Sequence, residues 1–145
     1  MHEVNPFAVL VAGIVPMVIG ALWYGPIFGR RWMALMEKTE EELREGFNPL
    51  RTYGVSFVLA LVTAFVLAQL VTEIAPGDVS SMEGSAGSGM VGVHLGLMAL
   101  VAFVLPAAHQ SVAFEKRKAG LAWLNIAYNG VALIAQAVVV VAVWR

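Results

Sequence analysis

Few side chains in this 145-residue chain could do covalent or metal chemistry, because the chain has no cysteine and only three histidines. His94 and His109 lie on one apolar run, so a helix would separate them by about 22 Å along its axis. That spacing prevents them from binding one metal ion within one chain. The sequence contains no Ser-His-Asp set, no paired carboxylates and no H-E-x-x-H motif. We therefore expect no metal, no cofactor and no enzymatic activity.

One nucleotide-binding pattern is present, since residues 87–92 read G-x-G-x-x-G. That fingerprint binds a dinucleotide only between a strand and a helix of a βαβ unit. Here a loop precedes the pattern and an apolar run follows it. We therefore interpret the match as accidental and expect no nucleotide site.

Polar residues inside the apolar runs are the better candidates for function. Counted at about 1.5 Å per residue along a helix, they fall into two depths of a bilayer. The predicted outer layer consists of Gln69, His94 and Gln136. The predicted inner layer consists of Trp23, Tyr24, Asn125, Tyr128 and Asn129. Such layers indicate either hydrogen bonds between helices or a path lined for a solute.

Composition places these layers in a membrane protein. The chain is 59% hydrophobic and 13% charged, whereas soluble domains average about 45–50% and about 25%. Its net charge of −1 argues against a nucleic-acid partner. Four apolar runs, at residues 6–28, 53–75, 87–109 and 121–144, reach the length of about 20 residues that a membrane-spanning helix needs. The sequence thus predicts an all-α membrane protein, a four-transmembrane-helix bundle forming one domain over residues 1–145.

Basic residues predict the orientation of this bundle. Eight of the nine lysines and arginines fall in the first and third loops, residues 29–52 and 110–120. Loops rich in lysine and arginine stay in the cytoplasm. We therefore expect cytoplasmic first and third loops and external termini, in the inner (plasma) membrane of a bacterium. The first apolar run lacks the basic start of a secretory signal, which favours a retained span.

The first loop contains a helix signal of its own. Thr39 and Glu42 have the spacing of a capping box, and Glu40 can pair with Arg44 one turn later. Gly46 and the Asn48-Pro49 pair should end this helix. A short cytoplasmic helix is thus predicted between spans 1 and 2, either as a connector or as a docking surface for a partner.

Small residues recur at helical spacing in two of the spans. Such lines let helix backbones approach closely. They consist of Ser56, Ala60, Ala64 and Ala68 in the second span, continued by Thr72, and of Gly92 and Gly96 in the third. They could join helices within one bundle or between copies of the chain. Pro16 predicts a kink in the first span, and Gly25, Pro26 and Gly29 predict its end or bend.

The end of the first span carries a family resemblance. Residues 20–24, Gly-Ala-Leu-Trp-Tyr, together with Pro26, Phe28, Gly29 and Trp32, resemble the domain-of-unknown-function family numbered 1761. The likeness continues through residues 36–46 and returns in the last span at Asn125, Ala127, Tyr128 and Trp144. The resemblance implies a small four-span membrane protein and no agreed activity. The family pattern often has a histidine after the last-span tyrosine, where this chain has Asn129.

Three functions are compatible with these observations. The first is a non-enzymatic protein that assembles with itself or within a larger membrane complex. The second is a small-solute carrier or channel lined by the polar layers. The third is the binding of a lipid or quinone between spans at the level of Trp23 and Tyr24. In each case the lipid bilayer is the surrounding partner.

Overall fold

The computed structural model describes residues 4–74 and 85–143, and all regular structure in these ranges is helical. Four helices are long and apolar enough to cross a membrane: Pro6–Ile27, Pro49–Glu73, Gly89–Ala113 and Ala119–Val143. The predicted four-span fold is therefore confirmed. The second span begins at Pro49 rather than Tyr53, and the third continues to Ala113 beyond His109. Most of the loop predicted at 76–86, and Trp144 of the last predicted span, lie outside the described residues.

Several helices are divided into shorter elements. Chain order gives α1 (Pro6–Leu22), the π-helical turn η1 (Trp23–Ile27), α2 (Gly29–Met36), α3 (Glu40–Arg44), α4 (Pro49–Ile74), α6 (Ser85–Ala99), the π-helical turn η2 (Leu100–Val104), α7 (Leu105–Ala113) and α8 (Ala119–Val143). The first membrane span thus combines α1 and η1, and the third combines α6, η2 and α7.

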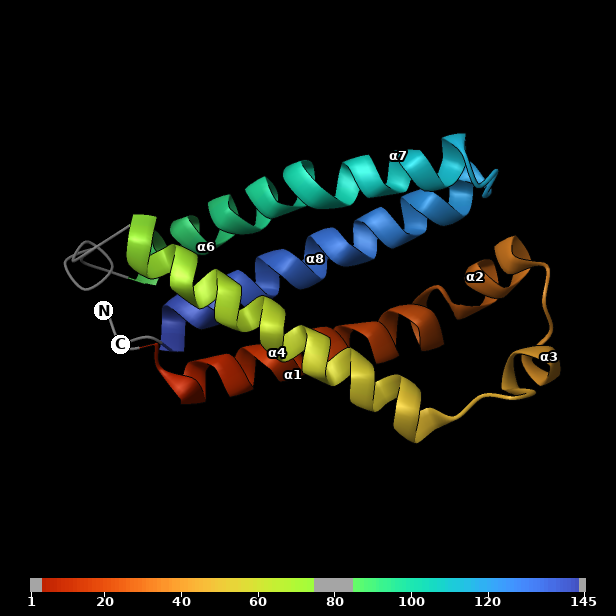
Figure 1. The fold of residues 1–145 in the computed structure, drawn as a ribbon, viewed down its shortest axis with the longest axis horizontal. Helices are drawn as coiled ribbons and strands as arrows, with labels where there is room; N and C mark the ends of the chain where they lie inside the picture. The colour runs from red at the N-terminus through yellow and green to blue at the C-terminus, as the bar shows by residue number, and fades with distance from the viewer. Residues whose placement is uncertain (1–3, 75–84, 144–145) are drawn as a thin grey trace.

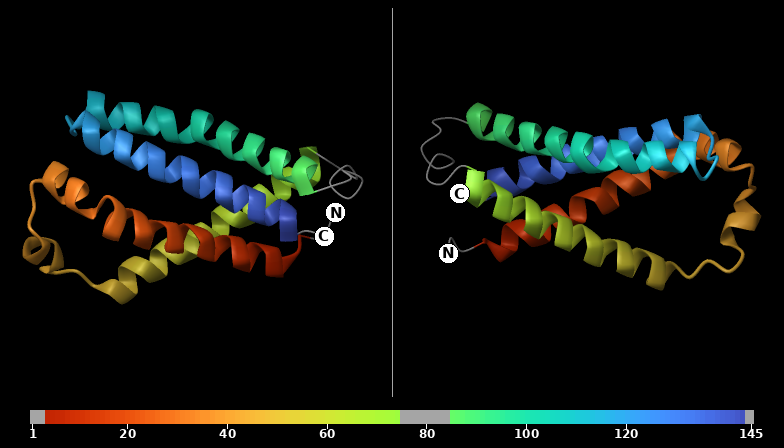
Figure 2. Two further views of the ribbon diagram at one scale, coloured as in Figure 1. Left: turned by 180° about the vertical axis from the view of Figure 1, so that it is seen from behind. Right: turned by 45° about the horizontal axis from the view of Figure 1, so that its top comes forward.

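The last helix, α8, is the centre of the bundle. It packs against α6 and α7 on one side and against α1 on the other, and it also contacts α4 (Figure 1). Helix α4 crosses α1 and then diverges from α8 toward α3, as both further views show (Figure 2). The segments α2, α3 and 114–118 lie together at what we call the loop end of the bundle. Asn5 and Val143 meet at the opposite end, where the Asn5 Nδ2 donates to the Val143 carbonyl at 3.4 Å.

The core lies toward the end opposite the loop end and consists of alanine and valine side chains with two leucines, Leu67 and Leu95. Ala12 of α1 and Ala64 and Ala68 of α4 are fully buried there, with Val140 and Val141 of α8. Short side chains at a helix crossing allow the backbones to approach and gain dispersion contacts. The helices are therefore held tightly in this half of the bundle.

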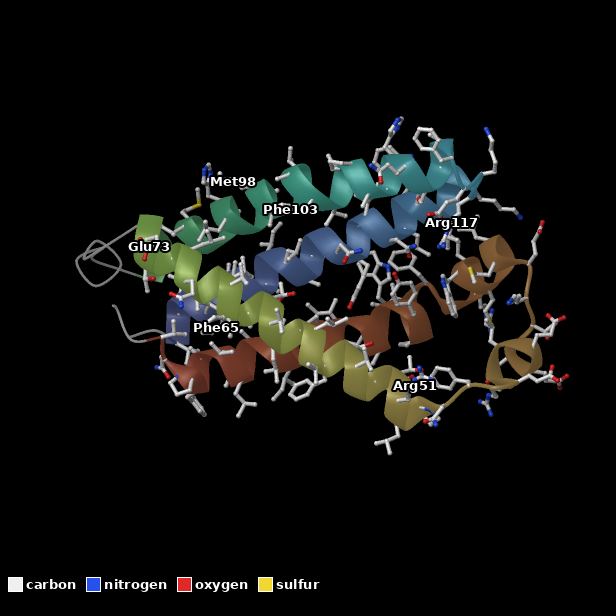
Figure 3. The ribbon with its side chains drawn as sticks, viewed as in Figure 1. Arg51, Phe65, Glu73, Met98, Phe103 and Arg117 are labelled. Carbon is white, nitrogen blue, oxygen red and sulfur yellow. The ribbon has the colours of Figure 1, made fainter. Side chains whose placement is uncertain are left out.

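The loop-end half of α4 is not covered by the rest of the chain. Tyr53, Val55, Val58 and Leu59 are all more than half exposed. Larger apolar side chains elsewhere also point outward, such as Phe65, Met98 and Phe103 (Figure 3). Apolar surface around spanning helices is the surface that lipid tails contact, which is consistent with a bilayer around this bundle.

The first span is interrupted at Gly25 and not at Pro16. Helix α1 continues through Pro16 to Leu22, so the proline expected to kink the helix does not end it. Gly25 has φ −102° and ψ −106°, outside helical values, and Pro26 follows it without an N–H to donate. The Phe28 N–H then bonds the Trp23 carbonyl at 2.9 Å, which closes a wide π-type turn. The predicted break at Gly25 and Pro26 is thus present.

The predicted capping box forms at the start of α3. The Glu42 N–H donates to Thr39 Oγ1 at 3.2 Å, and the Thr39 N–H donates to the Glu42 carboxylate at 2.8 Å. Gly46 follows the helix with φ +71°, a left-handed conformation that glycine adopts readily. The Asn48 Oδ1 accepts the Arg51 N–H at 3.0 Å. Asn48 therefore caps α4, which explains why the second span starts as early as Pro49.

Candidate functional site

The predicted outer polar layer does not form. Gln69 and His94 are exposed on the outside of the bundle. Gln136 is buried and 2% exposed, and its Nε2 donates to the Ala60 carbonyl at 2.8 Å. Gln136 reaches Ala60, which lies nine residues before Gln69 on α4, so Gln136 and Gln69 do not meet. Gln136 therefore joins α8 to α4, and the other two side chains face outward.

The predicted inner layer is brought together by hydrogen bonds. The Tyr24 hydroxyl of η1 donates to Asn125 Oδ1 of α8 at 2.8 Å. The Tyr128 hydroxyl donates to the Pro16 carbonyl at 3.0 Å, which links α8 to α1. The Asn129 Nδ2 donates to the Asn125 carbonyl at 2.8 Å within α8. These bonds fix the end of the first span against the last span.

Aromatic rings surround this network. The rings of Tyr24 and Tyr128 meet edge to face at 5.1 Å, and Tyr24 meets Trp32 of α2 in the same way at 5.5 Å. The ring centroid of Trp23 lies 4.6 Å from that of Phe28 and 6.4 Å from that of Tyr128. Its Nε1 is buried and has no hydrogen-bond partner among the described residues. Each such pair contributes about 0.5–1.5 kcal/mol beyond burial, so the rings add stability to this wall of packed aromatic side chains.

Two cavities adjoin along this wall, and we call them together the lateral groove. The deeper cavity, of about 590 Å³, lies between α1 and α4 with Tyr128 at its back; it is lined by Pro16, Met17, Gly20, Ala21, Tyr24, Gly25, Tyr53, Ser56 and Tyr128. The mouth, of about 550 Å³, is lined by Tyr24, Gly25, Gly29, Arg30, Trp32, Met33, Glu40, Leu43, Arg44, Phe47 and Tyr53. Tyr24, Gly25 and Tyr53 border both cavities, so the two lie side by side and share one wall.

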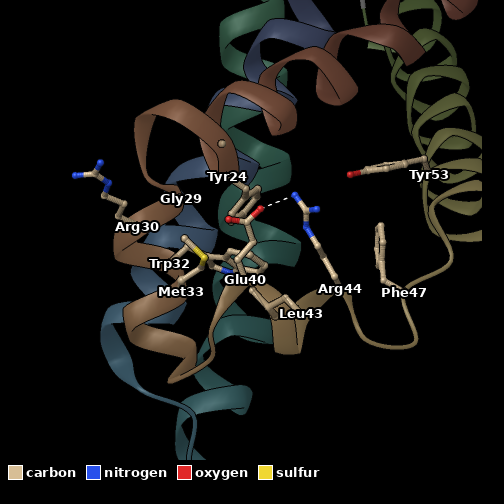
Figure 4. A pocket seen from close by; sticks show the side chains of 11 residues that line it. Tyr24, Gly29, Arg30, Trp32, Met33, Glu40, Leu43, Arg44, Phe47 and Tyr53 are labelled. Atoms are coloured by element: carbon tan, nitrogen blue, oxygen red, sulfur yellow. Dashed lines mark hydrogen bonds and ion pairs between the residues drawn. The ribbon is translucent and has the colours of Figure 1, made fainter.

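The mouth combines aromatic rings with one ion pair. Phe47 and Tyr53 meet edge to face at 5.8 Å on the α4 side. In Figure 4 the Glu40 and Arg44 side chains meet in the space between Tyr24 and Tyr53. The Arg44 Nη2 lies 2.5 Å from the Glu40 carboxylate. The Arg30 guanidinium is directed away from this pair. The groove therefore passes from apolar α1 side chains to a charged pair at the loop end.

The small-residue lines pack inside the chain. A Cβ built on Gly92 would lie 2.6 Å from the Val138 Cα, and one on Gly96 would lie 2.6 Å from the Ile134 Cα. Ala60, Ala64 and Ala68 face α1 and α8 and are buried, whereas Ser56 is exposed beside the groove. The two glycines and the three alanines therefore join helices of one bundle, which is one of the two roles that the sequence left open, whereas Ser56 does not.

One ion pair joins the two basic loops. The Lys118 ammonium lies 2.5 Å from the Glu37 carboxylate, and both side chains are substantially exposed. The hydrogen bond from Lys118, and then its charge, lower the pKa of Glu37 below the usual 4.5. Hydrogen bonds from the Thr39 backbone and side chain likewise lower the pKa of Glu42. Both carboxylates belong to the segments that frame the mouth.

Acid should therefore loosen the loop end. A carboxylate whose pKa is lowered by folding stabilises the fold above its unfolded pKa, here about 4.5, and loses that contribution as the pH falls through the lower folded value. Spin labels on Ala34→Cys and Ala119→Cys should report a fixed α2–α8 distance at about pH 7 and a broader one at about pH 3.5. Glu37→Gln in the same spin-labelled protein should show the broad distance distribution at both pH values. Identical distributions in all four samples would contradict this role.

No metal centre emerges from the part of the chain that the structure describes. Among residues 4–74 and 85–143, no three His, Asp or Glu side chains lie close enough to hold an ion. His94 and His109 are both exposed on the third span.

The comparisons with known proteins decide the family. The model of a family described as "Protein of unknown function (DUF1761)" matches residues 7–141. The chain belongs to this family. The match includes the Trp23-Tyr24 segment and the Asn125–Asn129 segment that carried the resemblance. Comparisons with curated proteins and with solved structures gave no match.

Several residues of the groove in this DUF1761 protein were not singled out from the sequence. Phe47 and Tyr53 are aromatic residues near the start of a span, which is also where an ordinary interfacial belt lies. Glu40 and Arg44 were predicted as a pair but not as part of a site. The Pro16 carbonyl accepts a bond only because α8 presents Tyr128 to it. The high number of aromatic residues on both sides of the first loop is the sequence signal that could have indicated Phe47 and Tyr53.

Proposed function

We propose that this membrane protein binds one lipid-like amphiphile in the lateral groove and does not act as an enzyme. The observation that carries the proposal is that the two cavities adjoin, with Tyr24, Gly25 and Tyr53 in the lining of both. Volumes of about 550 and 590 Å³ fall in the range of about 300–1,000 Å³ that ligand sites occupy. An apolar depth and a charged mouth match the two ends of an amphiphile.

The surroundings of the groove support entry from the bilayer. Ala21, Tyr53 and Ser56 line the deeper cavity and are exposed at the surface of the bundle. At that depth the surrounding phase is lipid, so a lipid tail could enter between α1 and α4 without crossing water. The hydrogen-bonded Tyr24 and Tyr128 would hold the back wall in place.

We also propose that the loop end faces the cytoplasm of a bacterial cell. The structure gathers α2, α3 and the 114–118 segment at one end, with the basic side chains of both loops. Arg51 and Arg117 lie at this end, and Glu73 lies at the other. This separation of the basic residues to one end supports a cytoplasmic loop end, because loops rich in lysine and arginine stay in the cytoplasm. The mouth would then open at the inner leaflet.

The other two functions have less support. A solute path through Gln69, His94, Asn125, Asn129 and Gln136 is disfavoured because two of these side chains face outward and Gln136 is bonded to Ala60. Homo-oligomeric or accessory assembly was motivated by small-residue lines. Those lines are occupied by helices of the same chain.

Filling the groove tests the proposal. Ala21→Trp would place an indole in the deeper cavity, from a position where alanine is exposed. We expect native mass spectrometry of the wild-type protein, released from mild detergent, to show one lipid-sized adduct per chain. Ala21→Trp should lose at least about nine-tenths of this adduct, since it removes the apolar contacts of one tail.

The matched control is Ala107→Trp, which adds the same side chain to an exposed position on α7 away from the groove. It should retain the adduct at the wild-type level. A wild-type protein without any adduct, or equal adducts on all three proteins, would contradict groove binding. Melting curves of the variants would show that the bundle remains folded.

A further inference from the structure

The ion pair at the mouth indicates which headgroup the groove would select. We propose that the occupant is a zwitterionic phospholipid, with its phosphate on the Arg44 guanidinium and its amine on the Glu40 carboxylate. This inference rests on the proposed function and makes it more specific. It concerns only the mouth of the groove and not the deeper cavity, where a lipid tail would bind.

The first support is the position of the pair. Glu40 and Arg44 stand one turn apart on α3, and their side chains extend into the mouth between Tyr24 and Tyr53. The two side chains are 66% and 77% exposed, so a ligand could reach both. The capping box at Thr39 fixes the start of the helix that presents them. A headgroup lying along the pair would touch a cation and an anion at the same time.

The second support is charge complementarity. The pair has no net charge, so an anionic headgroup bound by Arg44 would also face the Glu40 carboxylate. A zwitterion compensates both members, because its phosphate and its amine are joined by a short linker. Guanidinium groups bind phosphate through two parallel hydrogen bonds. The match therefore favours a phosphate and an ammonium on one headgroup over a phosphate alone.

The third support is the set of rings around the pair. Tyr24 and Trp32 form one edge-to-face pair in the mouth, and Phe47 and Tyr53 form another. Ammonium groups are attracted to the faces of aromatic rings. An amine near Glu40 would thus meet both a carboxylate and π-electrons. A second exposed pair, Arg117 with Glu115, has a similar N–O distance of 2.6 Å but does not line the groove.

A lipid competition tests the inference. The full-length, delipidated protein would be incubated with equal amounts of phosphatidylethanolamine, phosphatidylglycerol and diacylglycerol with identical acyl chains. Retained lipids would then be counted by mass spectrometry. We expect the wild type to retain phosphatidylethanolamine about fivefold over phosphatidylglycerol, a factor at the upper end of what an exposed ion pair contributes. Diacylglycerol should be retained least.

Single substitutions should change the preference in opposite ways. Glu40→Gln leaves Arg44 without an internal carboxylate, so it should shift the preference to phosphatidylglycerol. Arg44→Gln should reduce both phospholipids to the level of diacylglycerol. Glu115→Gln and Arg117→Gln make the same charge changes outside the groove and should leave the ratios unchanged.

The outcomes separate this inference from the proposed function. Equal retention of the three lipids by the wild type would overturn the headgroup assignment and leave groove binding intact. Retention of none would overturn both. A preference that the Glu115 and Arg117 variants change as much as the Glu40 and Arg44 variants would show a general surface-charge effect and contradict the assignment. Because the wild-type ratio is itself decisive, misfolding of a variant would not remove the test.

Discussion

Replacing Gly92 with alanine should destabilise the bundle by about 1–3 kcal/mol, the usual cost of overpacking. Helix propensity alone predicts the opposite effect on stability, since alanine in a helix is more favourable than glycine by about 1 kcal/mol. A Cβ at this position would lie 2.6 Å from the Val138 Cα and 2.7 Å from its backbone nitrogen. Backbone atoms cannot rotate away, so α6 and α8 would have to separate. Gly96→Ala should behave alike, because its Cβ would approach Ile134 equally closely.

Gly89→Ala is the matched control for these two variants. It lies on the same helix, but among the described residues no atom of another helix stands within 4 Å of its added Cβ. Unfolding by SDS in mixed micelles, followed by tryptophan fluorescence, should give a midpoint for Gly89→Ala at or above the wild-type value. Equal midpoints for all three variants would contradict the close α6–α8 contact. A lower native mass with unchanged midpoints would instead assign Gly92 to an oligomer contact.

Tyr128→Ala should cost about 2 kcal/mol, roughly half the cost of deleting a fully buried aromatic ring, because Tyr128 is half-buried. The substitution removes the ring that packs on Trp23 and Tyr24 and the hydroxyl that bonds the Pro16 carbonyl. Tyr128→Phe retains the rings and should lose only about 0.6 kcal/mol, the average for a hydrogen bond between membrane helices. Both effects would be measured by the same SDS unfolding assay.

Tyr53→Ala separates the stability of the wall from the occupancy of the groove. Tyr53 borders both cavities but is 57% exposed, so its loss should change stability by less than about 0.5 kcal/mol. It should still reduce the retained adduct, as Tyr128→Ala should. If Tyr128→Ala were no more destabilising than Tyr53→Ala, the Tyr128 ring would not join α8 to the first span.

The two polar layers show how far depth alone can predict a site. The inner layer was predicted from position along the helix axes, and its residues do bond and stack. The outer layer was predicted in the same way, and its residues face different sides. Depth gives one coordinate of a side chain, and the direction around the helix axis gives the other. In a membrane that direction is hard to predict, because the lipid-facing side of a helix is as apolar as its packed side.

Local signals were more informative where they depend on nearby residues only. The Thr39–Glu42 capping box, the Glu40–Arg44 pair and the break at Gly25 and Pro26 involve contacts within a few positions. Short-range chemistry of this kind needs no knowledge of the fold. The end of the first span was therefore located from its glycines and proline, although its wide π-type turn was not.

By itself the sequence determined the membrane class and the number of spans, because these follow from the length and apolar character of the four runs. Only the tertiary structure decided that α4 crosses α1 and diverges from α8. That crossing turns Tyr53 toward Tyr24 and opens the groove between them. The packing of α6 on α8 likewise commits Gly92 and Gly96 to contacts inside the chain, and Ala64 is buried in the core. The reason is physical: small residues permit close approach to any helix, and the partner is selected only when all four helices pack together.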